Sequence, residues 1–334
     1  MATKIKTSLY FPDFKLNITS NDRNIFDLVV KQFPQSWLKK KKYLSRLPRL
    51  TIQLTYHKTK YSNLPSFQTD HYEGGFALSY NQFIKEERIH IDVGPRTLTT
   101  TIDPKTNVIT SFIATPPDIE KDLLFDLIFF QPLKHLLLLH GLYLFHSSLV
   151  AINNKGVLFS GKSGNGKSVL SLTLLKSGFN YLGDDEVILR PVDTHIECSS
   201  FLSRPKIKKN LLYLFPEFKD GLLPTLSRKD KVSININKLF PDRIRNKVKP
   251  YLLIFPQYVK SSDIKSRPIG RKSILNYLVR EEFQHLRLWG RNISSTHFRV
   301  VTNLINQVKA YRLYYNDHNL NKIPGVISEL LKSC

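Results

Sequence analysis

Hydrophobic and polar residues alternate in several short runs within residues 1–115, and this alternation is typical of β-strands. The runs occupy residues 50–56, 88–93, 96–102 and 108–113. A turn-forming sequence that contains Pro104 and Asn107 separates the last two runs. Because short turns join strands that run in opposite directions, we predict a β-rich N-terminal domain with an antiparallel sheet over residues 1–115.

The pattern changes after residue 115, where strand-like and helix-like runs follow one another as they do in α/β units. The apolar run of residues 123–145 is interrupted by charged residues and by Pro132, so we expect a core helix with a break at the proline rather than a membrane span. Three later runs predict a helix, a strand and a final helix at residues 298–308, residues 310–315 and the residues after Pro324. Residues 116–334 are therefore predicted to form a second domain of the α/β class.

A phosphate-binding loop is predicted at residues 161–168. The sequence Gly-Lys-Ser-Gly-Asn-Gly-Lys-Ser fits the pattern G-x-x-x-x-G-K-[ST], and it lies between strand-like residues 156–160 and helix-like residues 169–176. Glycines let successive backbone amides turn inward, and the start of a helix adds unsatisfied amides that favour an anion. In such a loop Lys167 reaches the β- and γ-phosphates and Ser168 offers its hydroxyl to Mg²⁺. The predicted nucleotide-binding residues are Gly161, Lys162, Ser163, Gly164, Asn165, Gly166, Lys167, Ser168 and Val169.

Two adjacent carboxylates, Asp184 and Asp185, follow Lys167 by 17 and 18 residues. One helix and a tight turn span this interval, so the pair is expected to return beside the strand that precedes the loop, near the transferred phosphate. Neighbouring residues at a strand end point in different directions. One carboxylate could therefore hold Mg²⁺ while the other accepts the proton of an attacking hydroxyl. This arrangement favours transfer to a hydroxyl over the chemistry of a motor ATPase.

The chain is strongly basic, with 50 Lys and Arg against 27 Asp and Glu and a net charge of +23. More than half of the excess lies in residues 201–272, which hold 18 basic and 5 acidic side chains. Such a segment suits phosphates, an acidic peptide or a terminal carboxylate, and it is equally typical of a solvated surface. Arg204 is the candidate phosphate or substrate ligand because it is near the aspartates in sequence. Two cysteines and the lack of an apolar leader predict a reduced, cytoplasmic protein.

Four motifs together resemble the core of the HPr kinase/phosphorylase superfamily. They are residues 145–148 (Phe-His-Ser-Ser), the phosphate loop, residues 174–179 (Leu-Leu-Lys-Ser-Gly-Phe) and residues 183–186 (Gly-Asp-Asp-Glu). The resemblance implies a phosphoenolpyruvate-carboxykinase-like nucleotide-binding core that uses ATP, or another nucleoside triphosphate, together with Mg²⁺.

The same resemblance implies roles for individual residues. One aspartate of the pair is the general base, for which Asp185 is favoured, and Asp184 then lies near the metal with Ser168. The resemblance also places His146 at the active site, so either Asp185 or His146 would handle the proton of the substrate. Because HPr kinases assemble, the resemblance also points to a homo-oligomer.

Two departures separate the chain from true HPr kinases. Val169 stands where those kinases have Glu, and their downstream glycine-rich signature is not recognisable in residues 195–260. The chain is more similar to the branch that includes kinases of lasso-peptide precursors, which phosphorylate a C-terminal serine. The prediction is therefore a Mg²⁺-dependent kinase whose acceptor is a serine-containing peptide, such as a ribosomal precursor peptide.

Three alternatives stay open. An HPr-type protein serine kinase would share the same core. A nucleic-acid-stimulated P-loop ATPase would explain the net charge of +23, although no known nucleic-acid-binding motif is found in the sequence. A nucleotide-binding scaffold of a peptide-modifying system would bind the nucleotide and transfer nothing.

Overall fold

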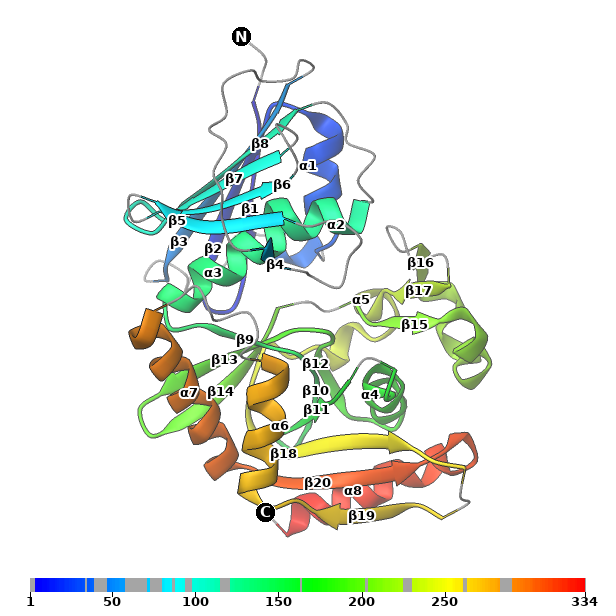
Figure 1. Cartoon of the computed structure of the whole chain (residues 1–334). Coiled ribbons are helices and arrows are strands. Elements are labelled where there is room, and N and C mark those ends of the chain that lie inside the picture. Colours follow the sequence, from blue (N-terminus) through cyan, green and yellow to red (C-terminus); the bar gives the residue numbers. More distant parts are fainter. Residues whose placement is uncertain are drawn as a thin grey trace. The chain divides into compact units, whose positions relative to one another are not determined.

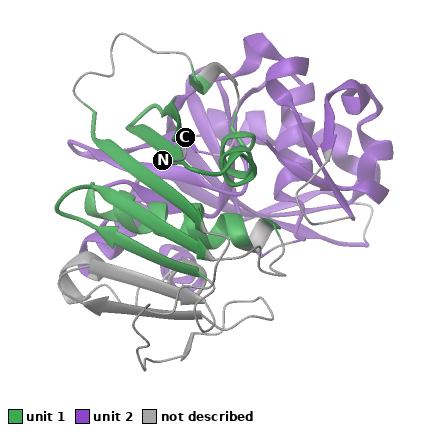
Figure 2. Cartoon of the chain, turned by 90° about the horizontal axis from the view of Figure 1, so that it is seen from above, with its two compact units in different colours: residues 1–140 green, residues 141–334 purple. Residues whose placement is uncertain are grey.

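The computed structural model describes most of the chain: residues 4–33, 35–38, 47–57, 71–72, 80–85, 88–93, 98–114, 121–162, 164–201, 204–224, 230–260, 263–282 and 290–333. The chain divides into two compact units, residues 1–140 and residues 141–334 (Figure 2). The sequence pattern suggested a domain boundary at residue 115. The helices that follow that point group with the first unit, because they cover its sheet.

The first unit is built on a sheet of eight described strands in the order β1-β2-β3-β8-β7-β6-β5-β4 (Figure 1). The strands are β1 (Ile5–Tyr10), β2 (Lys15–Ser20), β3 (Arg49–His57), β4 (His71–Tyr72), β5 (Tyr80–Lys85), β6 (Arg88–Val93), β7 (Leu98–Asp103) and β8 (Val108–Ala114). The expected antiparallel pairing holds from β4 to β8 and between β1 and β2, but β3 is parallel to both β2 and β8. Long connections allow this, because α1 (Arg23–Val30) lies between β2 and β3 and four strands lie between β3 and β8.

A helical segment covers one face of this sheet: α2 (Lys121–Phe125), the π-helix η3 (Asp126–Phe130) and α3 (Gln131–Leu139). Helical structure continues through Pro132, but the regular α-helix is interrupted at this point, because a π turn ends at Phe130 and α3 begins at Gln131 with the proline in its first turn. Proline would clash with the carbonyl four residues earlier in a regular α-helix, and the wider π turn relieves that clash. Buried hydroxyls of the sheet compensate, because Ser111 Oγ donates to the carbonyl of Ile128 and Thr100 Oγ1 donates to that of Leu127, each at 3.4 Å. No helix in the described part of the chain is long and apolar enough to cross a membrane.

The second unit is a mixed α/β structure built on nine described strands (Figure 1). They are β9 (Tyr143–Phe145), β10 (Ser147–Ile152), β11 (Lys155–Ser160), β12 (Asn180–Gly183), β13 (Val187–Val192), β14 (His195–Ser200), β18 (Lys247–Tyr258), β19 (Lys265–Pro268) and β20 (Lys309–Tyr315). The order is β12-β10-β11-β18-β14-β13-β9, and β20 pairs with both β18 and β19. The strands β11, β18 and β20 are mutually parallel neighbours. They therefore end at the same edge of the sheet.

Four helices accompany this sheet: α4 (Lys167–Lys176), α6 (Arg271–Glu282), α7 (Gly290–Gln307) and α8 (Ile323–Lys332). The predicted helix after the phosphate loop, the strand at residues 310–315 and the final helix are thus all present. Apolar side chains of α4 and α8 share one core with those of β10, β11, β18 and β20. This core fixes the start of α4 against the ends of the parallel strands.

The basic segment of residues 201–272 contains a small antiparallel sheet in the order β15-β17-β16. Its strands are β15 (Lys206–Lys208), β16 (Leu222–Pro224) and β17 (Lys231–Ile234), and short helical turns connect it, including α5 (Ile236–Leu239). Buried side chains such as Ile207, Phe218 and Ile234 join the core around α4. The described part of the segment is therefore folded against α4.

Candidate active site

The predicted phosphate loop lies between the end of β11 and the start of α4. Gly166 directly precedes α4 and has a left-handed backbone with φ 88°. A side chain there would be strained, and its Cβ would also come within 1.6 Å of the hydroxyl of Tyr315. Ser163 lies outside the described residues. The loop thus has the strand–loop–helix setting that a phosphate cradle requires.

Tyr315, at the end of β20, supports the loop from the side. Its hydroxyl donates to the backbone carbonyl of Asn165 at 3.1 Å, and the side chain is almost completely buried. Burial raises the pKa of Tyr315, so the phenol stays protonated and keeps donating. Sequence reasoning placed Tyr315 on a strand but missed this contact, because nothing local indicates that β20 ends beside the loop.

Lys167, the first residue of α4, is buried and turned into the loop. Its Nζ donates to the carbonyl of Gly161 at 2.5 Å and to that of Lys162 at 3.4 Å. A phosphate oxygen carries more negative charge than these carbonyls and would be a stronger acceptor for the same ammonium group. The side chain of Val169 is buried in the core that α4 shares with the sheet.

Asp184 follows β12 and is held by two hydroxyls. Its Oδ2 accepts from Ser168 Oγ at 2.7 Å, and its Oδ1 accepts from Ser148 Oγ of β10. Burial and the charge of Asp185 raise the pKa of Asp184 to about 6, while the two hydroxyls and Lys167 oppose the rise. The expectation that the acidic pair returns beside β11 is corrected in one respect. Strand β10 lies between β12 and β11, and Ser148 bridges the gap.

Asp185 occupies the centre of a tight turn that follows β12. Its φ is 64°, and the amide of Glu186 donates to the carbonyl of Asp184 at 2.8 Å across it. A non-glycine residue with positive φ is strained, and such strain is concentrated at functional sites. The turn separates the two carboxylates, since Asp184 is buried whereas the side chain of Asp185 is 41% exposed. Asp185 is therefore the carboxylate that a substrate from solution can reach.

Lys206 of β15 brings a positive charge to this turn. Its Nζ lies 3.9 Å from Asp185 Oδ2, and both side chains are partly exposed. Arg204, which the sequence suggested as a phosphate ligand, lies just before β15 and is partly buried, and burial lowers its pKa. Sequence reasoning grouped Lys206 with the general basic surface and missed its proximity to Asp185. Tertiary packing fixes that position, since β15 pairs with β17 and Ile207 of β15 joins the core around α4.

His146 lies between β9 and β10, next to the acidic turn. Its Nδ1 is 3.9 Å from Glu186 Oε1, and its side chain is 44% exposed while that of Glu186 is 11% exposed. Phe145 of β9 pairs with Val187 of β13, and the two strands are antiparallel. His146 follows Phe145 and Glu186 precedes Val187, so the pairing places His146 and Glu186 side by side. His146 thus reaches the predicted site through Glu186, a residue that the sequence analysis did not single out.

The residues around Asp184 fit a Mg²⁺ ion. No group of three or more His, Cys, Asp or Glu side chains is arranged as a metal cage within the described ranges. Mg²⁺ needs no such cage, because it is usually held by one or two carboxylates, waters and substrate phosphates. A loop serine bonded to a buried aspartate is the donor pair of phosphate-loop enzymes.

The hydroxyl of Tyr181 on β12 is also buried, and it has no hydrogen-bond partner in the part of the chain that the structure describes.

Comparisons with known proteins give little further guidance. No protein-family model matches the chain, and no curated protein matches it. Among solved structures, the HPr(Ser) kinase/phosphatase from Coxiella burnetii is similar over 57% of this chain and 94% of its own, with 19% sequence identity and a TM-score of 0.31. A TM-score this low does not establish a shared fold.

Proposed function

We propose that this protein is a Mg²⁺-dependent kinase that transfers the terminal phosphoryl group of a nucleoside triphosphate to a serine hydroxyl. The observation that carries the proposal is the hydrogen bond between Ser168 of the phosphate loop and buried Asp184, with accessible Asp185 next in the chain. A phosphate loop alone indicates nucleotide binding. A second carboxylate at the same place, open to solvent, supports a base for an incoming hydroxyl.

In the proposed reaction, the residues of the site have separate roles. Lys167 and the amides at the start of α4 hold the phosphates and stabilise the charge that spreads over them during transfer. Ser168 and Asp184 would hold Mg²⁺, which supplies further charge neutralisation at the phosphates. The acceptor oxygen forms a bond to the terminal phosphorus, the bond to the bridging oxygen breaks, and the nucleoside diphosphate leaves. Asp185 accepts the proton of the acceptor hydroxyl.

A peptide is the acceptor that the charges favour. Lys206 lies at the acidic turn, and the basic residues 201–272 are folded into the same unit as the phosphate loop. Basic side chains in that position suit a peptide with acidic residues or a C-terminal carboxylate. A serine at the C-terminus of a ribosomal precursor peptide offers both an acceptor hydroxyl and a terminal carboxylate. A serine of an HPr-type protein is the alternative acceptor for the same chemistry.

Transfer of radiolabelled phosphate from ATP to serine-containing peptides tests the proposal. Lys167→Ala and Asp185→Asn are each expected to lower the rate by about 10²-fold or more, because each removes charge stabilisation or the base. Asp193→Asn is a matched control, since Asp193 is also an exposed aspartate with positive φ, here 48°, in the turn between β13 and β14. Transfer at the parent rate by Asp185→Asn would refute the assigned base. Nucleotide binding with no transfer to any serine acceptor would favour a scaffold.

A further inference from the structure

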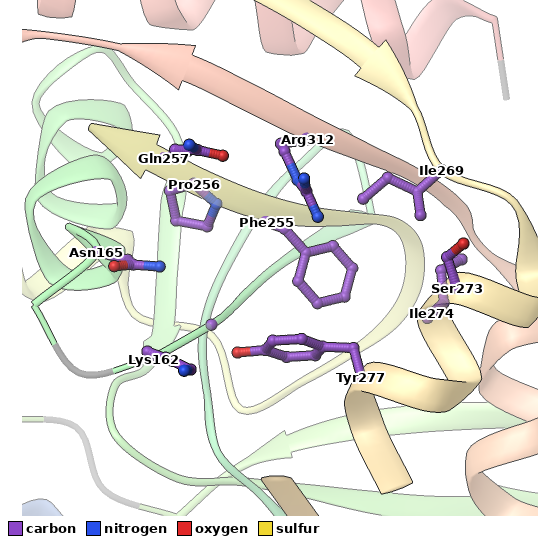
Figure 3. A pocket seen from close by; sticks show the side chains of 11 residues that line it. Lys162, Asn165, Phe255, Pro256, Gln257, Ile269, Ser273, Ile274, Tyr277 and Arg312 are labelled. Atoms are coloured by element: carbon purple, nitrogen blue, oxygen red, sulfur yellow. The ribbon is translucent and has the colours of Figure 1, made fainter. Parts of the chain in front are cut away.

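A cavity of about 250 Å³ opens beside the phosphate loop and takes no part in the roles assigned above (Figure 3). Gly161, Lys162 and Asn165 of the loop form one side of it. The end of β18, the start of α6 and Arg312 of β20 form the rest. The cavity is thus continuous with the phosphate site, and any ligand that fills it would extend from the loop.

Aromatic and aliphatic side chains dominate the inner part of this cavity. The rings of Phe255 and Tyr277 meet edge to face, with centroids 5.0 Å apart and planes at 77°. Ile269 and Ile274 line it from the α6 side (Figure 3). Phe255 and Ile274 are buried, so these walls are fixed by packing. Flat apolar walls of this kind suit a flat aromatic ligand, which gains by stacking on them.

Several polar side chains also line the cavity. Gln257 and Arg312 are exposed residues of β18 and β20, and Ser273 lies in the first turn of α6. An amide can both donate and accept hydrogen bonds, and a guanidinium group donates several. A heteroaromatic ring with donors and acceptors on its rim would match this distribution. The cavity is smaller than the roughly 300–1,000 Å³ of sites for drug-sized ligands, which fits one ring system rather than a peptide.

The sheet order separates this cavity from the acidic turn. Strand β12, which Asp184 directly follows, lies on one side of β11 beyond β10, whereas β18 and β20 lie on the other side. The phosphate loop follows β11 and therefore lies between the two. A nucleotide whose terminal phosphate faces Asp184 and Asp185 would direct its opposite end toward the cavity.

We infer that this cavity binds the base of the nucleoside triphosphate and that it prefers a purine, a conclusion that rests on the proposed function. Stacking against Phe255 and Tyr277 supplies the preference, because a two-ring base covers more of these walls than a pyrimidine does. Stacking does not distinguish one purine from the other, so ATP and GTP are both expected to bind more tightly than UTP.

Calorimetric titration with four probes, each with Mg²⁺, tests the inference: ATP, GTP, UTP and inorganic tripolyphosphate. Ser273→Trp fills the cavity from an exposed position and is expected to weaken ATP binding by about tenfold or more while leaving tripolyphosphate binding unchanged. Asn276→Trp adds the same side chain at another exposed position of α6 that does not line the cavity, so it should behave like the parent. Tyr277→Ala is a second variant, which removes one stacking wall without filling the space.

The probes separate failure of this inference from failure of the proposed function. If both cavity variants keep the parent ratio of ATP to tripolyphosphate affinity, the base does not bind here, although the phosphate site stands. If UTP binds the parent as tightly as ATP does, the purine preference is refuted. If neither ATP nor tripolyphosphate binds the parent, or if Lys167→Ala leaves their binding unchanged, the proposed phosphate site is wrong and the base site with it.

Discussion

At the scale of single residues, the site depends on how one buried carboxylate is kept in place. Asp184 is almost completely buried, and a carboxylate in that position is costly unless hydrogen bonds and nearby positive charge compensate. Ser148 and Ser168 provide hydrogen bonds, and Lys167 provides charge. Of these three, only Ser148 lies outside the phosphate loop and its helix. It therefore offers a way to perturb Asp184 without changing the phosphate cradle.

We expect Ser148→Ala to weaken Mg²⁺-dependent activity, because its hydroxyl lowers the pKa of Asp184 and its removal lets that pKa rise. Protons then compete with Mg²⁺ for the carboxylate of Asp184 up to a higher pH. The half-saturating Mg²⁺ concentration should rise most at low pH, by roughly 10- to 150-fold, which corresponds to the ~1.5–3 kcal/mol of one hydrogen bond to a charged group. Ser147→Ala is the control, since Ser147 Oγ donates to the carbonyls of Ser148 and Phe159 instead. Equal effects of the two variants would show that Ser148 acts only on the fold.

Lys206 supports a second prediction at the residue scale. Its separation of 3.9 Å from Asp185 in a partly exposed setting contributes little to stability, with a typical value of ~0–1 kcal/mol. During transfer, the negative charge of the phosphoryl group lies close to the base Asp185. The positive charge of Lys206 would therefore stabilise the transferring phosphoryl group more than it stabilises the fold. Lys206→Met should lower kcat for transfer by about tenfold and leave the thermal midpoint nearly unchanged.

The control for this prediction is Lys208→Met, which makes the same charge change two residues away on β15 at an exposed position. It should leave kcat close to that of the parent. If both variants lowered kcat equally, the effect would belong to the general charge of the basic segment and not to the contact with Asp185.

At the scale of elements, local patterns predicted what strands and helices are, but not how distant elements pair. The run at residues 88–93 matches β6, and the loop motif locates both β11 and α4, since alternation and glycine spacing are local properties. The parallel pairing of β3 depends on contacts between distant residues, and no local signal encodes it.

The same limit applies to the site. Ser168 and Asp184 come together as the spacing predicted, because one helix and one turn join them. Three other residues reach the site from distant strands: Ser148 on β10, Lys206 on β15 and Tyr315 on β20. Tertiary pairing, which no local pattern encodes, places these strands there. The π turn before Pro132 was also missed, because it depends on hydroxyls from β7 and β8 that satisfy its carbonyls.

The π-helix η3 gives a stability prediction. Burial raises the pKa of Asp126 to about 6, and Gln131 Nε2 donates to its carboxylate at 3.4 Å. Because the folded pKa lies above the unfolded value, the folded state binds the proton more tightly, and the stabilisation is complete below about pH 4 and lost as pH rises to about 6. Asp126→Asn cannot ionise and should raise the free energy of unfolding at pH 7.5 by ~1–2 kcal/mol, with little change at pH 4. Urea unfolding at both pH values measures this, and equal destabilisation at both would contradict it.

At the scale of the whole molecule, the net charge of +23 is compatible both with the proposed kinase and with a nucleic-acid-stimulated ATPase. Both would attract polyanions, and the attraction between exposed charges is screened with a Debye length of about 10 Å at 0.1 M salt. The two differ in what the anion does after it binds. A peptide acceptor supplies a hydroxyl to the site, whereas a nucleic acid would change the rate of nucleotide hydrolysis.

Salt and polyanions therefore provide the last prediction. At saturating ATP, raising NaCl from about 50 to about 300 mM should increase KM for an acidic serine peptide by roughly 3- to 10-fold and change kcat little, because screening weakens encounter and not chemistry. A neutral peptide of the same length should show almost no dependence of KM on salt. Single-stranded RNA should inhibit transfer to the acidic peptide by competing for the basic residues 201–272, and it should not accelerate ATP hydrolysis. If RNA instead stimulated ATP hydrolysis, and if this stimulation fell steeply as salt rises, the result would favour the nucleic-acid-stimulated ATPase. A peptide kinase does not require RNA for its reaction.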